Sequence, residues 1–167
     1  MITYDFDPKD LEFDVKVREE CYSCKRYGKK ATCPPYIGNI EYYENLLKRY
    51  RHGMFVVCEF NVPDGIADTP EDIAKLGSTS SVELYRAVIT LRDLLTMDGH
   101  YFAVAFGAGS CKLCPGGCEF PCRLPAKSLV PIEATGVNVV EALKKFGVDI
   151  RFPIKGKFYR IGAIFYD

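Results

Sequence analysis

The chain has 167 residues, of which 48% are hydrophobic and 13% aromatic, so it can form one globular domain with a substantial core. Its 22 lysine and arginine residues balance its 22 aspartate and glutamate residues, so no net charge attracts nucleic acid or an anionic membrane. We therefore expect no nucleic-acid partner and no membrane partner, while the oligomeric state stays open.

The start of the chain is acidic rather than basic and has no continuous apolar run, so we expect neither a signal peptide nor a transit peptide. No stretch approaches the roughly 18 apolar residues of a membrane span. These features predict a cytoplasmic protein, whose thiols stay reduced and available for metals or catalysis. Pairing the eight cysteines as four disulfides is the least favoured interpretation.

Apolar periodicity and capping residues predict alternating strands and helices along the chain. The expected elements are a strand over 13–17, a helix over 40–50, a strand over 54–60, a helix over 80–98, a strand over 101–106, a helix over 139–146 and a strand over 158–166. Asn39 is the expected N-cap of the first helix, Ser80 with Glu83 forms the expected capping box of the second, and Asn138 opens the third.

This alternation predicts an α/β fold, with a single domain over residues 1–167 and a mainly parallel sheet of about four strands. Residues 61–77 are expected to form a long loop with one helical turn near 70–76. In a parallel sheet, loops that follow strands emerge at the carboxyl edge, where such sheets place their ligands. We therefore expect both cysteine-rich loops, and this long loop, to meet at one edge.

Four cysteines lie within twelve residues of each other in the second half of the chain. Cys111, Cys114, Cys118 and Cys122 have spacings of two, three and three residues, close to the two, two, three of bacterial ferredoxins. Four thiolates complete either a [4Fe–4S] cluster or a tetrahedral zinc site. The pattern is strong evidence for metal and weaker evidence for which metal.

Three further cysteines, Cys21, Cys24 and Cys33, leave a four-coordinate metal site one ligand short. Cys58, an outside molecule or a cysteine shared from the other set could supply the missing ligand. Cys58 lies in an apolar run, where a cysteine is most often a small buried hydrophobe. His52 and His100 lie at expected helix ends, and we expect them to be dipole partners or solvated turn residues rather than ligands.

Basic residues surround both sets of cysteines. They offset thiolate charge and offer a docking surface for an acidic electron carrier, although a solvated lysine surface explains them equally well. These residues are Lys25, Arg26, Lys29, Lys30, Lys112 and Arg123.

Two motifs resemble one family of predicted metal-binding, cysteine-rich proteins of unknown function, found mainly in anaerobic archaea and bacteria. They are Cys-Tyr-Ser-Cys-Lys-Arg-Tyr-Gly-Lys-Lys-Ala-Thr-Cys-Pro-Pro-Tyr and Gly-Ala-Gly-Ser-Cys-Lys-Leu-Cys, the second followed by Cys-Arg-Leu-Pro and Pro-Ile-Glu-Ala-Thr-Gly-Val-Asn-Val. The resemblance implies a metal or iron–sulfur cluster on all seven clustered cysteines and implies no reaction. Pro131-Ile132-Glu133 and Asn138 depart slightly from the family pattern, which argues against a role for that segment.

The leading hypothesis from sequence is a cytoplasmic iron–sulfur protein with one or two [4Fe–4S] clusters, acting in electron transfer or an accessory redox step with a redox protein partner. A structural zinc module that binds a partner is the main alternative. A third hypothesis makes the three-cysteine set an open site, used by an enzyme or a ligand carrier.

Overall fold

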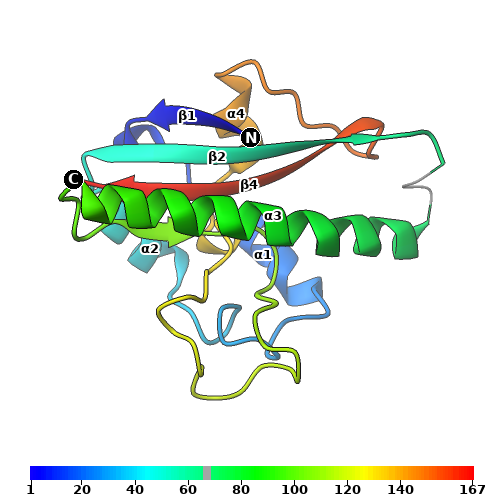
Figure 1. The fold of residues 1–167 in the computed structure, drawn as a ribbon, viewed down its shortest axis with the longest axis horizontal. Helices are drawn as coiled ribbons and strands as arrows, with labels where there is room; N and C mark the ends of the chain where they lie inside the picture. Colours follow the sequence, from blue (N-terminus) through cyan, green and yellow to red (C-terminus); the bar gives the residue numbers. More distant parts are fainter. Residues whose placement is uncertain (66–68) are drawn as a thin grey trace.

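A four-stranded antiparallel sheet forms the centre of the computed structural model, which describes residues 1–65 and 69–167 (Figure 1). The elements in chain order are β1 (Ile2–Phe6), η1 (Pro8–Asp10), α1 (Val15–Ser23), α2 (Ile40–Leu47), β2 (His52–Val62), α3 (Pro70–Met97), β3 (Val104–Phe106), η2 (Glu133–Thr135), α4 (Val139–Lys144) and β4 (Gly156–Tyr166). The strand order across the sheet is β1-β2-β4-β3.

The two long central strands pair along their whole length. The ladder runs from His52 opposite Tyr166 to Val62 opposite Gly156. Successive side chains of a strand point to opposite faces, so Val57 and Val56 enter different cores on the two sides of the sheet.

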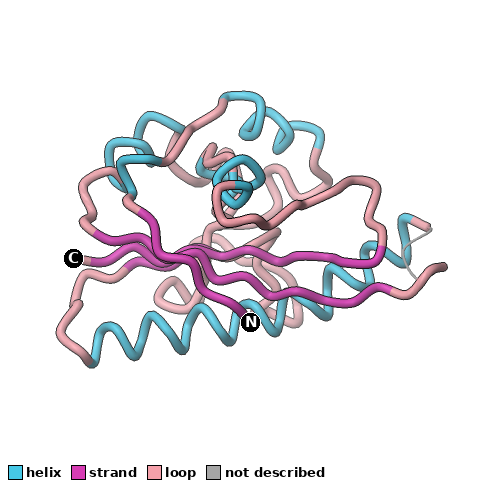
Figure 2. Tube along the Cα trace, turned by 90° about the horizontal axis from the view of Figure 1, so that it is seen from above, coloured by secondary structure: helices cyan, strands magenta, loops and turns pink. Residues whose placement is uncertain are grey.

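Helix α3 covers one face of the sheet, and the shorter helices cover the other (Figure 2). Leu84 and Val88 of α3 are 1% and 0% exposed and pack on Val56 and Ile164. Burying side chains of this size contributes about 1.5–3 kcal/mol each to folding. The long helix is therefore held by its contact with the sheet. Within the described residues, no helix is long and apolar enough to cross a membrane.

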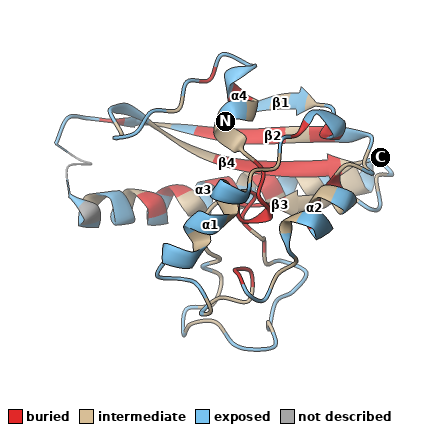
Figure 3. Cartoon of the chain, turned by 180° about the vertical axis from the view of Figure 1, so that it is seen from behind, coloured by how far each residue is buried: buried red, intermediate tan, exposed pale blue. Residues whose placement is uncertain are grey.

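On the opposite face, buried side chains from α2, α4 and the segment before η2 complete the larger core. Leu47, Leu143 and Ile132 are fully buried there against Phe55 and Phe165 of the central strands. Figure 3 shows that burial is concentrated in β2 and β4, whereas the loops beyond the sheet are mostly exposed or half-buried. The cysteine-rich part of the chain thus lies outside the main cores.

The expected parallel sheet is wrong, because all three strand pairs are antiparallel. The alternating pattern predicts the order of strands and helices along the chain. It does not predict strand direction, which depends on the end of the sheet to which each connection returns. The cysteine-rich loops therefore do not emerge at the carboxyl edge of parallel strands. They lie beyond edge strand β3 instead (Figure 1).

Two expected elements differ from the structure near the N-terminus. Most of the strand expected over 13–17 is the start of α1, because Asp14 caps a helix there and its side chain accepts the Lys16 amide at 2.9 Å. Phe13 forms only an isolated antiparallel bridge with Val137. The apolar alternation was too short to distinguish the two structures. The first strand is instead β1, at residues 2–6, which periodicity did not indicate.

The expected loop over 61–77 is also mostly ordered. Strand β2 continues to Val62, and α3 begins at Pro70 with a capping box between Thr69 and Asp72. The capping box expected at Ser80 therefore lies inside a longer helix, where its hydroxyl donates to the Leu76 carbonyl at 2.7 Å. Residues 66–68 of the expected loop lie outside the described residues.

Helices α2 and α4 do start after Asn39 and Asn138, whose side chains cap them.

Replacing Gly162 with alanine tests the close approach of α3 and β3 to β4. A Cβ at this position would lie 2.7 Å from both the Phe106 carbonyl oxygen and Val88 Cγ2. Overpacking of this kind should lower the free energy of unfolding by about 1–3 kcal/mol, measured by urea denaturation. Gly116→Ala is the matched control, because a Cβ there meets nothing within 4 Å, and equal losses in both variants would contradict the packing.

Candidate metal centre

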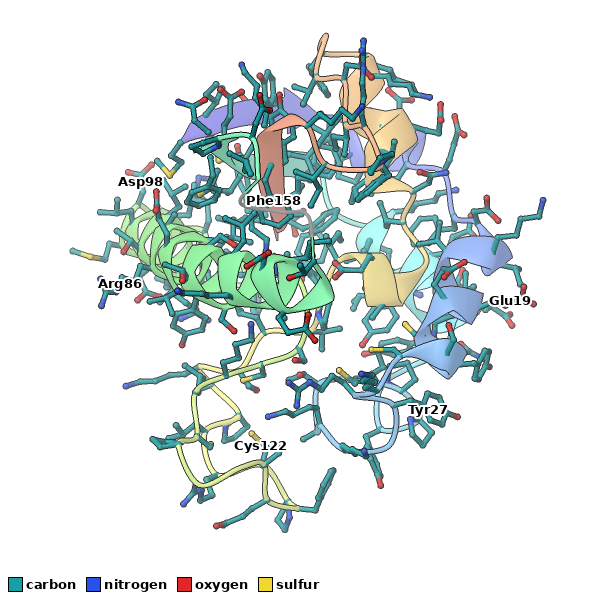
Figure 4. All side chains as sticks on the ribbon, turned by 90° about the vertical axis from the view of Figure 1, so that its right-hand side faces the viewer. Glu19, Tyr27, Arg86, Asp98, Cys122 and Phe158 are labelled. Atoms are coloured by element: carbon teal, nitrogen blue, oxygen red, sulfur yellow. The ribbon has the colours of Figure 1, made fainter. Side chains whose placement is uncertain are left out.

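Two loops that hold the clustered cysteines lie side by side beyond β3 (Figure 1). The first cysteine loop, residues 24–39, joins α1 to α2, and the second cysteine loop, residues 107–132, joins β3 to η2. Figure 4 shows the second loop, with Cys122, beside the first loop, with Tyr27. The Ala31 amide of the first loop donates to Cys118 Sγ of the second at 3.2 Å. All eight cysteines are free thiols.

The three-cysteine set is assembled at the end of α1. Cys21 lies in the last turn of the helix, and Cys24 is the C-cap, whose amide donates to the Cys21 carbonyl at 3.2 Å. Cys33 follows on the returning part of the first loop and is only 7% exposed. The three side chains line one cavity of about 190 Å³, into which the second loop also reaches.

Arg18 fixes the position of α1 relative to the rest of this cavity. Its guanidinium donates to the Gly38 carbonyl at 3.1 Å and to the Ala134 carbonyl of η2. Because Arg18 and Cys21 are three residues apart, they lie on the same side of the helix. The contact with η2 therefore holds Cys21 opposite Glu133, which lines the same cavity.

The four-cysteine set lines a second, smaller hollow. Cys111, Cys114, Cys118 and Cys122 all line this hollow of about 20 Å³, together with Ala31 and Thr32 of the first loop. Helix α3 anchors the loop, because Tyr85 donates to the Lys127 carbonyl at 2.7 Å and Arg92 to the Ala126 carbonyl at 3.2 Å. Both loops therefore contribute to the surroundings of the four thiols.

Thr32 has a buried hydroxyl without a hydrogen-bond partner among the described residues. Buried polar groups are almost always paired, and an unpaired one calls for an explanation. Thr32 lines the four-cysteine hollow, and its hydroxyl also lowers the pKa of the adjacent Cys33 thiol, so a thiolate of either set would be an acceptor for it. The donor chemistry of this hollow thus fits a thiolate-bound metal or cluster.

Among the described residues, the thiol sulfurs of neither set lie close enough together to coordinate one metal ion. Within the described ranges 1–65 and 69–167, no three cysteine, histidine, aspartate or glutamate side chains converge closely enough to coordinate one ion in the positions they occupy. Rotation about χ1 moves a thiol sulfur without moving the backbone, so side chains that line one hollow can approach a common centre.

Burial sets the protonation of the three-cysteine set. It raises the pKa of the Cys33 thiol to about 11 and raises the pKa of Cys21 as well, although Arg18 partly opposes the shift at Cys21. Desolvation disfavours a thiolate that has no cation beside it. A bound metal supplies that positive charge, so its binding releases thiol protons.

Glu133 is a residue of this cavity to which the sequence assigned no role. Its Oε1 accepts the Gly109 amide at 2.7 Å, which ties η2 to the start of the second loop. Burial raises the pKa of Glu133, an effect that the Gly109 hydrogen bond and the charge of Arg160 oppose. The sequence feature that could have identified Glu133 is a single carboxylate within the otherwise apolar run from Val130 to Ala134.

Neither Cys58 nor the histidines join the two sets. Cys58 is 1% exposed and packs under α3 with Leu84 and Val88, as expected for a small buried hydrophobe. His52 and His100 both lie against the ring of Tyr166 near the C-terminus, with ring centroids 5.2 and 4.9 Å away. The seven clustered cysteines therefore remain the predicted metal ligands.

Two adjoining thiol-lined hollows on a small antiparallel scaffold define a cysteine-rich protein equipped to hold metal. A family model described as "Predicted metal-binding protein (DUF2284)" matches residues 4–166. The chain therefore belongs to this family of predicted metal-binding proteins, which confirms the resemblance drawn from the two cysteine motifs. A search of curated proteins and a search of solved structures each found no match.

Substituting Cys58 tests whether the eighth cysteine is part of the core rather than a ligand. Cys58→Ala should lower the free energy of unfolding by about 1–2 kcal/mol, because it removes a buried side chain from the core under α3. Its metal content, measured by elemental analysis, should equal that of the unmodified chain. Cys118→Ala should instead lose metal, and loss of metal in Cys58→Ala would make Cys58 a ligand.

Proposed function

We propose that this chain is an iron–sulfur protein of electron transfer, with a [4Fe–4S] cluster on Cys111, Cys114, Cys118 and Cys122. A second metal centre is held by the three-cysteine set. The observation that carries the proposal is the shared hollow of the four thiols, which receives a backbone N–H from the first loop. Amide hydrogen bonds to cluster sulfurs are one of the means by which proteins tune reduction potential.

The cysteine spacing supports a cluster in this loop. Four thiolates within twelve residues resemble the compact ferredoxin arrangement more than the two separate pairs of a zinc ribbon. The Thr32 hydroxyl supports bound thiolates and does not distinguish a cluster from zinc. A reducing compartment such as the cytoplasm suits these thiols.

The two centres are close neighbours along the second loop. Gly109 lines the three-cysteine cavity, and Cys111 lines the four-cysteine hollow. The two Cα atoms are at most about 7 Å apart, because an extended chain spans no more than about 3.6 Å per residue. The two hollows therefore adjoin each other along the second loop, which supports passage of an electron between a metal in one and a metal in the other.

A structural zinc site is the second candidate function, and the size of the four-cysteine hollow favours it. A volume of about 20 Å³ is close to that of one water-sized probe, so the loop must widen more for an iron–sulfur cube than for a single ion. In this case the metal ties the two loops together, and the function lies in binding a partner.

The cavity lined by the three-cysteine set supports a third candidate function. Its volume of about 190 Å³ leaves room for a small molecule next to the thiols. A metal held there with an exchangeable fourth position would suit a ligand carrier or an enzyme.

Anaerobic purification followed by iron, sulfide and zinc analysis distinguishes a cluster from zinc. We expect about four iron and four labile sulfide for the four-cysteine set, with visible absorbance that dithionite bleaches. Cys114→Ala with Cys118→Ala should abolish that portion of the iron and sulfide. A colourless chain that contains zinc and no labile sulfide would overturn the iron–sulfur proposal in favour of the zinc module.

We also propose an acidic redox protein as the partner, because basic side chains gather near the two loops. Lys25, Arg26 and Lys29 of the first loop are exposed. Burial lowers the pKa of Lys112, and the nearby charges of Arg160, Arg26 and Lys30 lower it further. A chain with no net charge thus presents locally positive surface beside its metal centres.

Charge reversal tests this docking surface. Lys25→Glu with Lys29→Glu should lower the rate constant of electron exchange with a small acidic ferredoxin by about tenfold or more at low ionic strength, measured by stopped-flow absorbance. Lys9→Glu with Lys155→Glu makes the same change in net charge at exposed positions outside the two loops. Equal slowing by both pairs would mean that net charge alone, rather than docking on the loops, controls the rate.

A further inference from the structure

The three-cysteine set lacks a fourth protein ligand. The side chains that line its cavity limit which residue can supply that ligand. Cys58 is buried under α3 and does not line this cavity. A separate hollow is lined by Cys111, Cys114, Cys118 and Cys122. Two carboxylates, Glu20 and Glu133, do line the cavity beside the three thiols.

Glu133 and Glu20 differ in how they are held. Glu20 is an exposed residue of α1, free to extend into water. Glu133 is only partly exposed, lies on η2 and is oriented by the hydrogen bond from the Gly109 amide to Oε1. Since η2 is tied to α1 through Arg18, the carboxylate and the Cys21 thiol are positioned by the same contact.

The charges of the cavity also connect Glu133 with the thiols. Three thiolates and a carboxylate carry four negative charges around one cavity, and a bound divalent cation together with Arg26, which also lines the cavity, would offset most of them. A carboxylate with one oxygen bonded to an amide still has acceptor capacity on the other.

We propose that Glu133 is the fourth protein ligand of the metal held by Cys21, Cys24 and Cys33. The inference rests on the proposed metal-binding function. It completes a Cys₃Glu site for a single zinc ion, or the four protein ligands of a [4Fe–4S] cluster in which Glu133 binds the fourth iron. The Gly109 amide then acts as the outer hydrogen bond that orients a ligating carboxylate. The second loop thereby contributes to the three-cysteine centre as well as to its own.

Cobalt(II) is a suitable probe, because its visible bands and thiolate charge-transfer absorbance report the ligands around it. The titration uses the full metal-free chain carrying Cys114→Ala and Cys118→Ala, which disable the four-cysteine set. This background should bind one Co²⁺ per chain. No Co²⁺ binding by the background would refute the metal site on the three-cysteine set, and with it this part of the proposed function.

Glu133→Gln is then added to the same background. The amide keeps the shape of the side chain and an oxygen acceptor for Gly109, but it is a poor metal ligand. We expect the affinity for Co²⁺ to fall at least about tenfold and the visible bands to shift. Circular dichroism and urea unfolding of the metal-free chains check that both variants fold alike.

Glu20→Gln is the matched control, because it removes the same charge from the rim of the same cavity. It should lower the affinity for Co²⁺ much less than Glu133→Gln does, through lost charge alone, and it should leave the visible bands unchanged. If Glu133→Gln behaves like this control, or loses affinity with unchanged bands, Glu133 is not a ligand and the inference is overturned. In either case the metal site itself, shown by binding in the background chain, still stands.

Discussion

The antiparallel pairing of β2 with β4 is the constraint on which the rest of the structure depends. Eleven residues of each strand pair without interruption, and their alternate side chains supply both hydrophobic cores. Helix α3 can pack only on the face that carries Val56 and Ile164, and the short helices only on the face with Phe55 and Phe165. Strand β3 then adds to β4 at the edge and directs the following chain away from the sheet.

The cysteine loops contain little regular structure, so they depend on contacts at their ends and flanks. Arg18 joins α1 to η2, the Gly109 amide joins the second loop to Glu133, and α3 holds the returning part of that loop through Tyr85. These contacts use backbone carbonyls and amides of neighbouring elements. The thiols are thus carried on segments whose positions are set outside the loops themselves.

Local signals in the sequence were sufficient for much of this molecule. Asn39 and Asn138 marked the starts of two helices, because a capping side chain acts within three residues of itself. Cysteine spacing separated the two sets, and a single cysteine within an apolar run indicated that Cys58 is buried. Each of these inferences depends on neighbours along the chain.

The features that sequence did not reveal depend on contacts between distant segments. Strand direction is one of them, since β2 and β4 pair across about ninety residues of intervening chain. The position of Glu133 is another, because its neighbour Gly109 lies 24 residues away in sequence. The error at residues 13–17 is a local exception, because the Asp14 N-cap that starts α1 lies within two residues of its partner and the alternation was too short to decide.

The hydrogen bond from Ala31 to Cys118 has a consequence for both sets of thiols. It makes a residue between Cys24 and Cys33 part of the environment of the other set, so ordering either loop restricts the other. A displacement of the first loop therefore alters the hydrogen bond at a thiol of the second, and a displacement of Cys118 alters the backbone between Cys24 and Cys33. The two cysteine loops are thus structurally coupled, and neither set of thiols has surroundings that are independent of the other.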